Sequence, residues 1–195
     1  MRRIEIALAW IFGTIFLVLS FVVTIETISR KVFNFSLQGA DELGGYSLAI
    51  GSTIAFCLAL AGRNHIRVDV FHDLFPRGWK AALNWLSIMG IAAGALLFVA
   101  VSLRVLRESL EYGSTAQTPW ATPLIYPQSL WYLGLVFFML LAVGFAARAT
   151  WLILKGRIDE LNVEFHPKSA KEELKEELDD FAQRSAGAPE AGAKP

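Results

Sequence analysis

Residues 81–103 read AALNWLSIMGIAAGALLFVAVSL, a run of 23 amino acids without a charged side chain. The hydrocarbon core of a bilayer is roughly 30 Å thick, and a helix crosses it with about 20 apolar residues. Because lipid offers backbone groups no hydrogen-bond partner, a run of this kind must be helical. A helix of a soluble bundle would carry a polar face with a period of 3.6 residues, and this stretch is apolar on all sides. The run therefore predicts a transmembrane helix.

Three further segments have the same character. Residues 6–25 and 43–62 are uncharged, and residues 129–154 contain only Arg148. We therefore expect an all-α integral membrane protein with spans at about 4–28, 43–62, 80–103 and 129–154, inside a membrane domain of residues 1–157. The start, Met1-Arg2-Arg3 and then apolar residues, is similar to a signal peptide. Its apolar stretch is longer than the usual 7–15 residues, which predicts an uncleaved first helix.

The charges show how the spans are oriented. The chain has 18 basic and 18 acidic residues, and a net charge of zero excludes a nucleic-acid binder that relies on bulk positive charge. Lys and Arg near helix ends favour the cytoplasmic side. If both termini are cytoplasmic, nine such residues lie on the cytoplasmic side and four on the opposite side, which favours this orientation. The nine are Arg2, Arg3, Arg63, Arg67, Arg77, Lys80, Arg148, Lys155 and Arg157, and the four are Arg30, Lys31, Arg104 and Arg107.

The connection at residues 63–76 has an amphipathic pattern. Ile66, Val70 and Leu74 recur at i, i+4 and i+8, and most other positions are charged or histidine. This spacing predicts a short helix lying in the headgroup plane, with membrane lipid as its partner. Residues 66–70 also alternate with period two, so an extended start stays open.

Residues 158–195 form a charged cytoplasmic tail. From residue 155 to the end there are 7 basic and 10 acidic residues, so the tail is acidic and the membrane part basic. Residues 169–172 fit a capping box that starts a short helix, which either docks on a partner or is solvated. Residues 185–195 are rich in Ala, Gly and Pro, which predicts disorder in part of the tail.

No set of residues predicts catalysis or cofactor binding. The three histidines, His65, His72 and His166, lie outside the predicted spans, and Cys57 is the single cysteine. We therefore expect no catalytic residues, no metal and no cofactor, and the protein is not predicted to be an enzyme. Transport would place a charge near the middle of a span, and the spans have none there. An accessory subunit is favoured; the alternatives are a stand-alone small membrane transporter or channel and a membrane enzyme or redox anchor.

An acidic pair, Asp41 and Glu42, begins the second span. A helix N-terminus favours negative charge, which explains the pair without a partner. The alternative is that both carboxylates contact another subunit.

Three motifs in this order carry a family resemblance: Glu42 at the start of the second span, the sequence RNHIRVD at 63–69, and TPLIYPQ at 122–128. The chain resembles the small membrane subunit (DctQ-like) of tripartite ATP-independent periplasmic (TRAP) transporters over roughly residues 1–156. The candidate partner-contact or motif residues are Asp41, Glu42, Arg63, His65, Arg67, Asp69, Pro123, Pro127 and Gln128.

The resemblance implies a role in the bacterial inner membrane. A periplasmic solute-binding protein would capture an organic acid, such as a C4-dicarboxylate or related carboxylate. A large multi-helix permease subunit would carry it inward with sodium, and the small subunit would act as its scaffold. Substrate-binding residues and the sodium coupling would then belong to the partners, so none is expected in this chain.

Overall fold

The computed structural model describes residues 2–36, 38–62, 76–165, 178–179 and 181–182. Four long helices dominate it: α1 (Arg2–Val32), α2 (Ala40–Ala61), α3 (Arg77–Glu111) and α4 (Ile125–Leu154), followed by the short α5 (Ile158–Phe165). Each long helix has the length and apolar composition to cross a membrane. The predicted class, an all-α integral membrane protein with four spans, is confirmed. The predicted interfacial segment lies outside the described residues, and the orientation of the termini stays a prediction.

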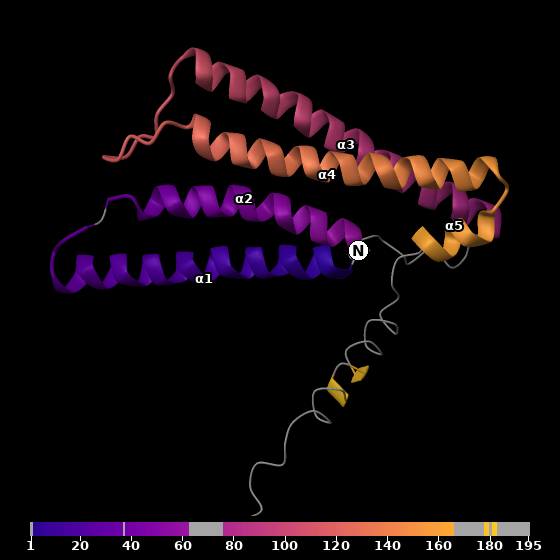
Figure 1. Cartoon of the computed structure of the whole chain (residues 1–195), viewed down its shortest axis with the longest axis horizontal. Helices are drawn as coiled ribbons and strands as arrows, with labels where there is room; N and C mark the ends of the chain where they lie inside the picture. Colours follow the sequence, from indigo (N-terminus) through magenta and orange to yellow (C-terminus); the bar gives the residue numbers. More distant parts are fainter. Residues whose placement is uncertain (1, 37, 63–75, 166–177, 180, 183–195) are drawn as a thin grey trace, which may run out of the picture.

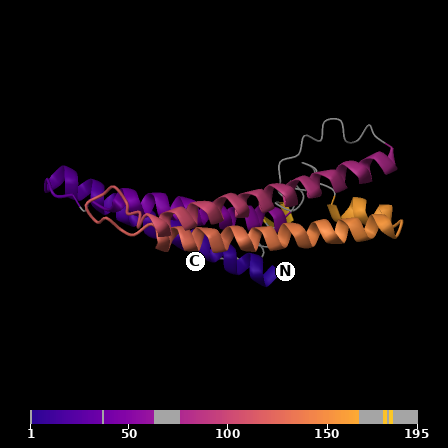
Figure 2. The same ribbon diagram turned by 90° about the horizontal axis from the view of Figure 1, so that it is seen from above.

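The long helices pack in an order that differs from their order in the chain. α1 packs on α2, α2 on α4, and α4 on α3, while α5 packs on α3 and α4. Figure 1 shows α2 and α4 in the middle, with α1 and α3 on the outside. We call the end with the connections 33–39 and 112–124 the loop end, and the other the α5 end. The two pairs are staggered along the long axis: α3 and α4 reach further at the α5 end (Figures 1 and 2).

The contact between α3 and α4 is built from small side chains. On α3 the buried positions include Ala81, Ile88, Ala92 and Ala95, spaced by seven, four and three residues. Buried residues on α4 follow a similar spacing: Leu135, Phe138, Ala142, Ala146, Ala149 and Leu152. This is the spacing of a coiled-coil seam, and small residues let two membrane helices approach closely. All of these residues except Leu135 belong to the hydrophobic core.

The contact between α2 and α4 depends on one glycine. A Cβ atom added to Gly134 would lie 2.2 Å from Oγ1 of Thr53 and 2.8 Å from its Cβ. Nearby, the rings of Phe56 and Phe138 lie 5.6 Å apart, centre to centre. The GxxxG step at Gly90 and Gly94 makes no such approach, since an added Cβ would meet nothing within 4 Å in the described part of the chain.

The outermost helix, α1, is attached along a narrow strip. Its better-covered positions are Leu8, Phe12, Ile15, Phe16, Leu19, Val22, Glu26 and Ser29, most of them spaced by four and three, whereas the rest of the helix is mainly exposed from Ile6 onward. The ring of Phe16 lies over Gly51 of α2, 2.5 Å from where a Cβ would stand. Glu26 and Ser29 are the polar members of this strip and lie near its loop end.

The observed helix limits extend the predicted spans. α3 continues to Glu111, beyond the predicted limit of 103, and α4 begins at Ile125 instead of 129. Pro127 therefore lies in the first turn of α4, where a helix tolerates proline because the N–H groups of that turn have no partner in the helix. α5 falls within the segment predicted as a tail, where its packing was not anticipated.

A glycine turn allows α5 to fold back. Gly156 has φ of 70°, a conformation that glycine adopts without strain, and Arg157 N–H donates to the Leu152 carbonyl at 3.0 Å. This is the pattern of a Schellman motif. It directs α5 onto α3 and α4, where Leu161 is fully buried and Phe165 nearly so.

Candidate functional site

Two of the three sequence motifs meet at the loop end. Glu42, in the first turn of α2, is buried with 6% of its surface exposed. Its Oε2 accepts a hydrogen bond of 3.1 Å from the hydroxyl of Tyr46, and Thr122 of the TPLIYPQ motif also interacts with that hydroxyl. The start of α2 is thereby connected to the segment that precedes α4.

The 112–124 connection is folded into a compact unit that covers this junction. Ala116 N–H donates to the Thr122 carbonyl and Leu124 N–H to the Ser114 carbonyl, both at 2.9 Å. The indole of Trp120 packs directly on Gly39, since an added Cβ there would lie 2.3 Å from the ring. The residue before α2 must therefore be small for the connection to reach the helix.

Three buried oxygen atoms at the loop end have no hydrogen-bond partner within the described residues. They are Oε1 of Glu42, Oγ1 of Thr118 and Oε1 of Gln128, from α2, from the connection and from the first turn of α4. Buried polar atoms of proteins are nearly always paired, and an unpaired one costs about 1–3 kcal/mol. We refer to Glu42, Tyr46, Thr118, Thr122 and Gln128 as the polar junction.

The structure separates the two acidic residues that the sequence pairs. Asp41 is exposed, whereas Glu42 points into its own chain. Pro123 is exposed, and Pro127 and Gln128 are half-buried. Of the two carboxylates, that of Asp41 is therefore the one on the surface. The predicted role of these residues in partner contact stays a prediction.

The RNHIRVD motif, with Arg63, His65, Arg67 and Asp69, lies outside the described residues. Among the residues that are described, no group of three His, Cys, Asp or Glu side chains could hold a metal ion together. The expectation of no metal and no cofactor stays untested by this finding.

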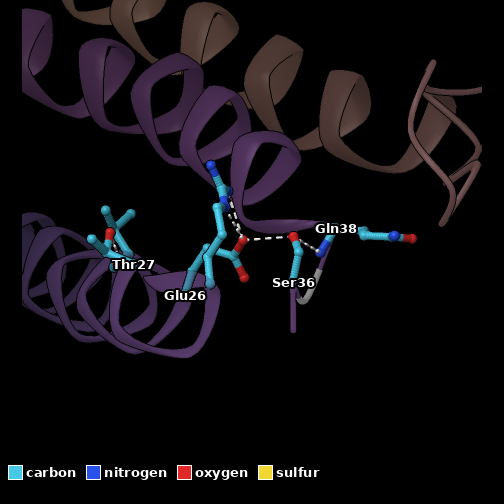
Figure 3. Close-up of polar contacts among 6 residues, drawn as sticks. Glu26, Thr27, Ser36 and Gln38 are labelled. Atoms are coloured by element: carbon cyan, nitrogen blue, oxygen red, sulfur yellow. Dashed lines mark hydrogen bonds and ion pairs between the residues drawn. The ribbon is translucent and has the colours of Figure 1, made fainter. Parts of the chain in front are cut away.

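A second polar cluster at the loop end centres on Glu26 of α1. Its carboxylate is 3% exposed, and its Oε1 accepts hydrogen bonds from Arg30 at 2.6 Å and from the Ser36 hydroxyl at 2.7 Å. Ser36 Oγ in turn accepts the N–H of Gln38 at 3.2 Å. Figure 3 shows the carboxylate turned toward Ser36 and the connection to α2. The pair of Glu26 and Arg30 lies within α1, and the bond to Ser36 links this helix to the connection that follows it.

At the α5 end, polar contacts that sequence reasoning did not predict join three helices. Asn84 of α3, 2% exposed, donates to Asn162 of α5 at 3.2 Å, and Arg148 of α4 pairs with Glu164. The Trp85 indole donates to the Thr150 hydroxyl at 2.9 Å. A buried asparagine in an apolar span was the one signal that a partner helix must cover it.

These observations define the class. A chain of four apolar spans, joined internally by small-residue seams and polar contacts at both ends, is a multi-pass membrane protein. A family model, described as the DctQ component of tripartite ATP-independent periplasmic transporters, matches residues 19–150. The chain belongs to this family and is the small membrane component of a TRAP transporter, located in the inner membrane. A comparison with curated protein sequences finds no matching relative.

Proposed function

We propose that this chain holds the large multi-helix permease subunit of its transporter in place and has no substrate site of its own. The observation that carries this proposal is the polar junction. Glu42 and Thr122 belong to the family motifs, and Tyr46 links them: its hydroxyl donates to Glu42 and also interacts with Thr122, so the start of α2 is tied to the connection before α4. Their arrangement supports a rigid body and leaves the outer helices free for contacts.

The exposed surface of the spans supports the same role. α1 exposes large apolar side chains from Ile6 to Val32, among them Trp10 at 74% and Phe21 at 63%, and α3 exposes Leu97 at 62%. Such a surface is covered by lipid or by another membrane protein. A large subunit with apolar helices of its own is the partner that fits it.

We place the chemistry of transport in the partners. The middle of each described span carries no charged side chain, whereas ion and substrate paths in membranes are marked by ionisable residues. We infer that the large subunit binds sodium and an organic acid, a C4-dicarboxylate or a related carboxylate, and that a periplasmic binding protein delivers the acid. With both termini in the cytoplasm, the loop end with Arg30 and Asp41 would face that binding protein.

Reconstitution tests whether the large subunit, and not this chain, carries out transport. We expect proteoliposomes with the large subunit, this chain and the binding protein to take up the organic acid when a sodium gradient is imposed. Proteoliposomes that contain this chain alone should show no uptake above empty vesicles. Uptake by this chain alone would replace the proposal with a stand-alone transporter.

Copurification tests the contact at Asp41. The variant Asp41→Lys should lower the amount of large subunit that copurifies several-fold, because a surface charge facing a partner is reversed. Glu111→Lys makes the same change in charge at an exposed residue of the loop end and should leave copurification unchanged. Equal recovery with both variants would remove Asp41 from the interface.

A further inference from the structure

Two cationic side chains flank one tryptophan where α4 ends. Lys155 Nζ lies 4.6 Å from the centre of the Trp151 ring, and Arg157 Cζ lies 5.7 Å from it. Both distances are within the range of cation–π attraction. The indole is 43% exposed, so one side of this group is open.

The backbone turn after α4 creates this arrangement. Lys155 follows Trp151 by one helical turn and therefore lies above it on the same face. Gly156, with φ of 70°, reverses the chain, and Arg157 returns beside the ring instead of continuing away from it. The group of Trp151, Lys155 and Arg157, which we call the α4-end cluster, is thus fixed by backbone geometry.

The cluster carries a surplus positive charge. Arg157 is paired with Glu160 at 2.5 Å, with both side chains about half-exposed, and Arg148, three residues before Trp151, is paired with Glu164. Within the described ranges, Lys155 has no carboxylate partner. Two cations next to one ring are therefore balanced by a single carboxylate, which leaves a net charge of +1 open to a ligand.

The position of the cluster along α4 indicates the ligand. Leu154 is 81% exposed and directly precedes Lys155, so the surface changes from apolar to charged at this point. Tryptophan is enriched at this depth of the membrane, level with the headgroups. The anion that is abundant there is the phosphate of an acidic phospholipid, which basic groups near helix ends attract.

We propose that Trp151, Lys155 and Arg157 form a binding site for the phosphate group of an anionic phospholipid, with its acyl chain along the exposed apolar surface next to Leu154. The ammonium and the guanidinium hold the phosphate, and the indole keeps the two cations together at headgroup depth. The site requires no other subunit, so its test does not depend on the proposed scaffold function.

Native mass spectrometry of the full chain tests this site. The chain is purified into detergent micelles that contain equal amounts of phosphatidylglycerol and phosphatidylcholine, and retained lipids are counted. We expect the wild type to retain phosphatidylglycerol in preference. The double variant Lys155→Gln/Arg157→Gln should bind phosphatidylglycerol roughly 25-fold more weakly, about fivefold for each charge. Its helix content, measured by circular dichroism, should equal that of the wild type.

Four comparisons distinguish this site from nonspecific attraction of anionic lipids to positive charge. Arg104→Gln/Arg107→Gln removes two exposed cations at the loop end of α3 and should change retention less than twofold. Lys155→Arg/Arg157→Lys keeps both charges and should retain binding, whereas Glu160→Gln frees Arg157 and should strengthen it a few-fold. Inorganic phosphate in excess should not displace the lipid.

Three results would overturn the proposal. The first is equal retention of the two lipids by the wild type. The second is an equal loss in the Arg104/Arg107 control variant. The third is displacement of the lipid by inorganic phosphate, which would show a site for the free ion.

Discussion

The pair α3–α4 and the helix α1 attach to their neighbours in different ways. Between α3 and α4, Ala95, Ala142 and Ala149 are at most 1% exposed, and α5 closes the far end of the pair. α1 has no buried residue in its most apolar stretch, and its one nearly fully buried side chain among those described is the carboxylate of Glu26. Lipid is as apolar as a leucine side chain, so close packing and polar contacts decide helix association in a membrane. The α3–α4 pair combines close packing with the hydrogen bond from Trp85 to Thr150, whereas α1 has little close packing, and the bond between Glu26 and Ser36 ties it to the connection that follows it.

The largest effect on stability should come from weakening the packing of α5 at the α5 end of the α3–α4 pair. Leu161→Ala removes a fully buried side chain of α5, and such a change costs about 3 kcal/mol. We expect a lower melting temperature in detergent and faster hydrogen exchange throughout α5. Val163→Ala, at a position 75% exposed, should leave both unchanged. If Leu161→Ala has no more effect than Val163→Ala, α5 is not part of the packed structure.

A smaller effect should follow at the contact between α2 and α4, which joins the α1–α2 pair to the α3–α4 pair. Gly134→Ala places a Cβ 2.2 Å from Thr53 Oγ1, and overpacking of this kind costs about 2 kcal/mol. The melting temperature should fall, whereas Gly144→Ala, with nothing within 4 Å of the new atom, should not lower it. Adding Thr53→Ala to Gly134→Ala removes the closest atom and should recover part of the loss. No recovery would show that the strain arises elsewhere.

The smallest effect should be confined to α1. Glu26→Gln keeps the size of the side chain and removes the charge that accepts from Arg30 and Ser36. We expect a loss of about 1 kcal/mol, seen as faster hydrogen exchange in residues 33–39, with exchange in α3 and α4 unchanged. Thr27→Val serves as the control, since Thr27 is exposed and bonds the Val23 carbonyl of its own helix. Faster exchange across all helices would contradict a local role for Glu26.

The number of spans could be predicted because each is longer than a bilayer is thick and carries its charges at the ends. Glu26 and Arg30 have the i, i+4 spacing that permits an ion pair on a helix, without requiring one. Both depend on local sequence alone. The helix limits were less predictable: α4 starts at Ile125 because Pro127 fits a first turn, and composition does not separate a proline that stops a helix from one that begins it.

The packing order and the role of α5 could not be derived from local patterns. Gly90 and Gly94 carry the recognisable GxxxG spacing and make no close approach within the described chain, whereas the isolated Gly134 does. Which glycine is needed depends on the helix that arrives opposite it. Asn84 likewise signals a partner but not which one, and its partner Asn162 follows 78 residues later.

The packing order also has a consequence for biogenesis. Helices enter the membrane in chain order and then associate, but α2 packs on α1 and α4, and α3 lies on the far side of α4. When α1 and α2 have been inserted, Thr53 and Phe56 face lipid, and the insertion of α3 does not cover them. Assembly of the core therefore waits for the last span, and a ribosome stalled before residue 125 would leave a hairpin in the membrane that cannot complete the fold.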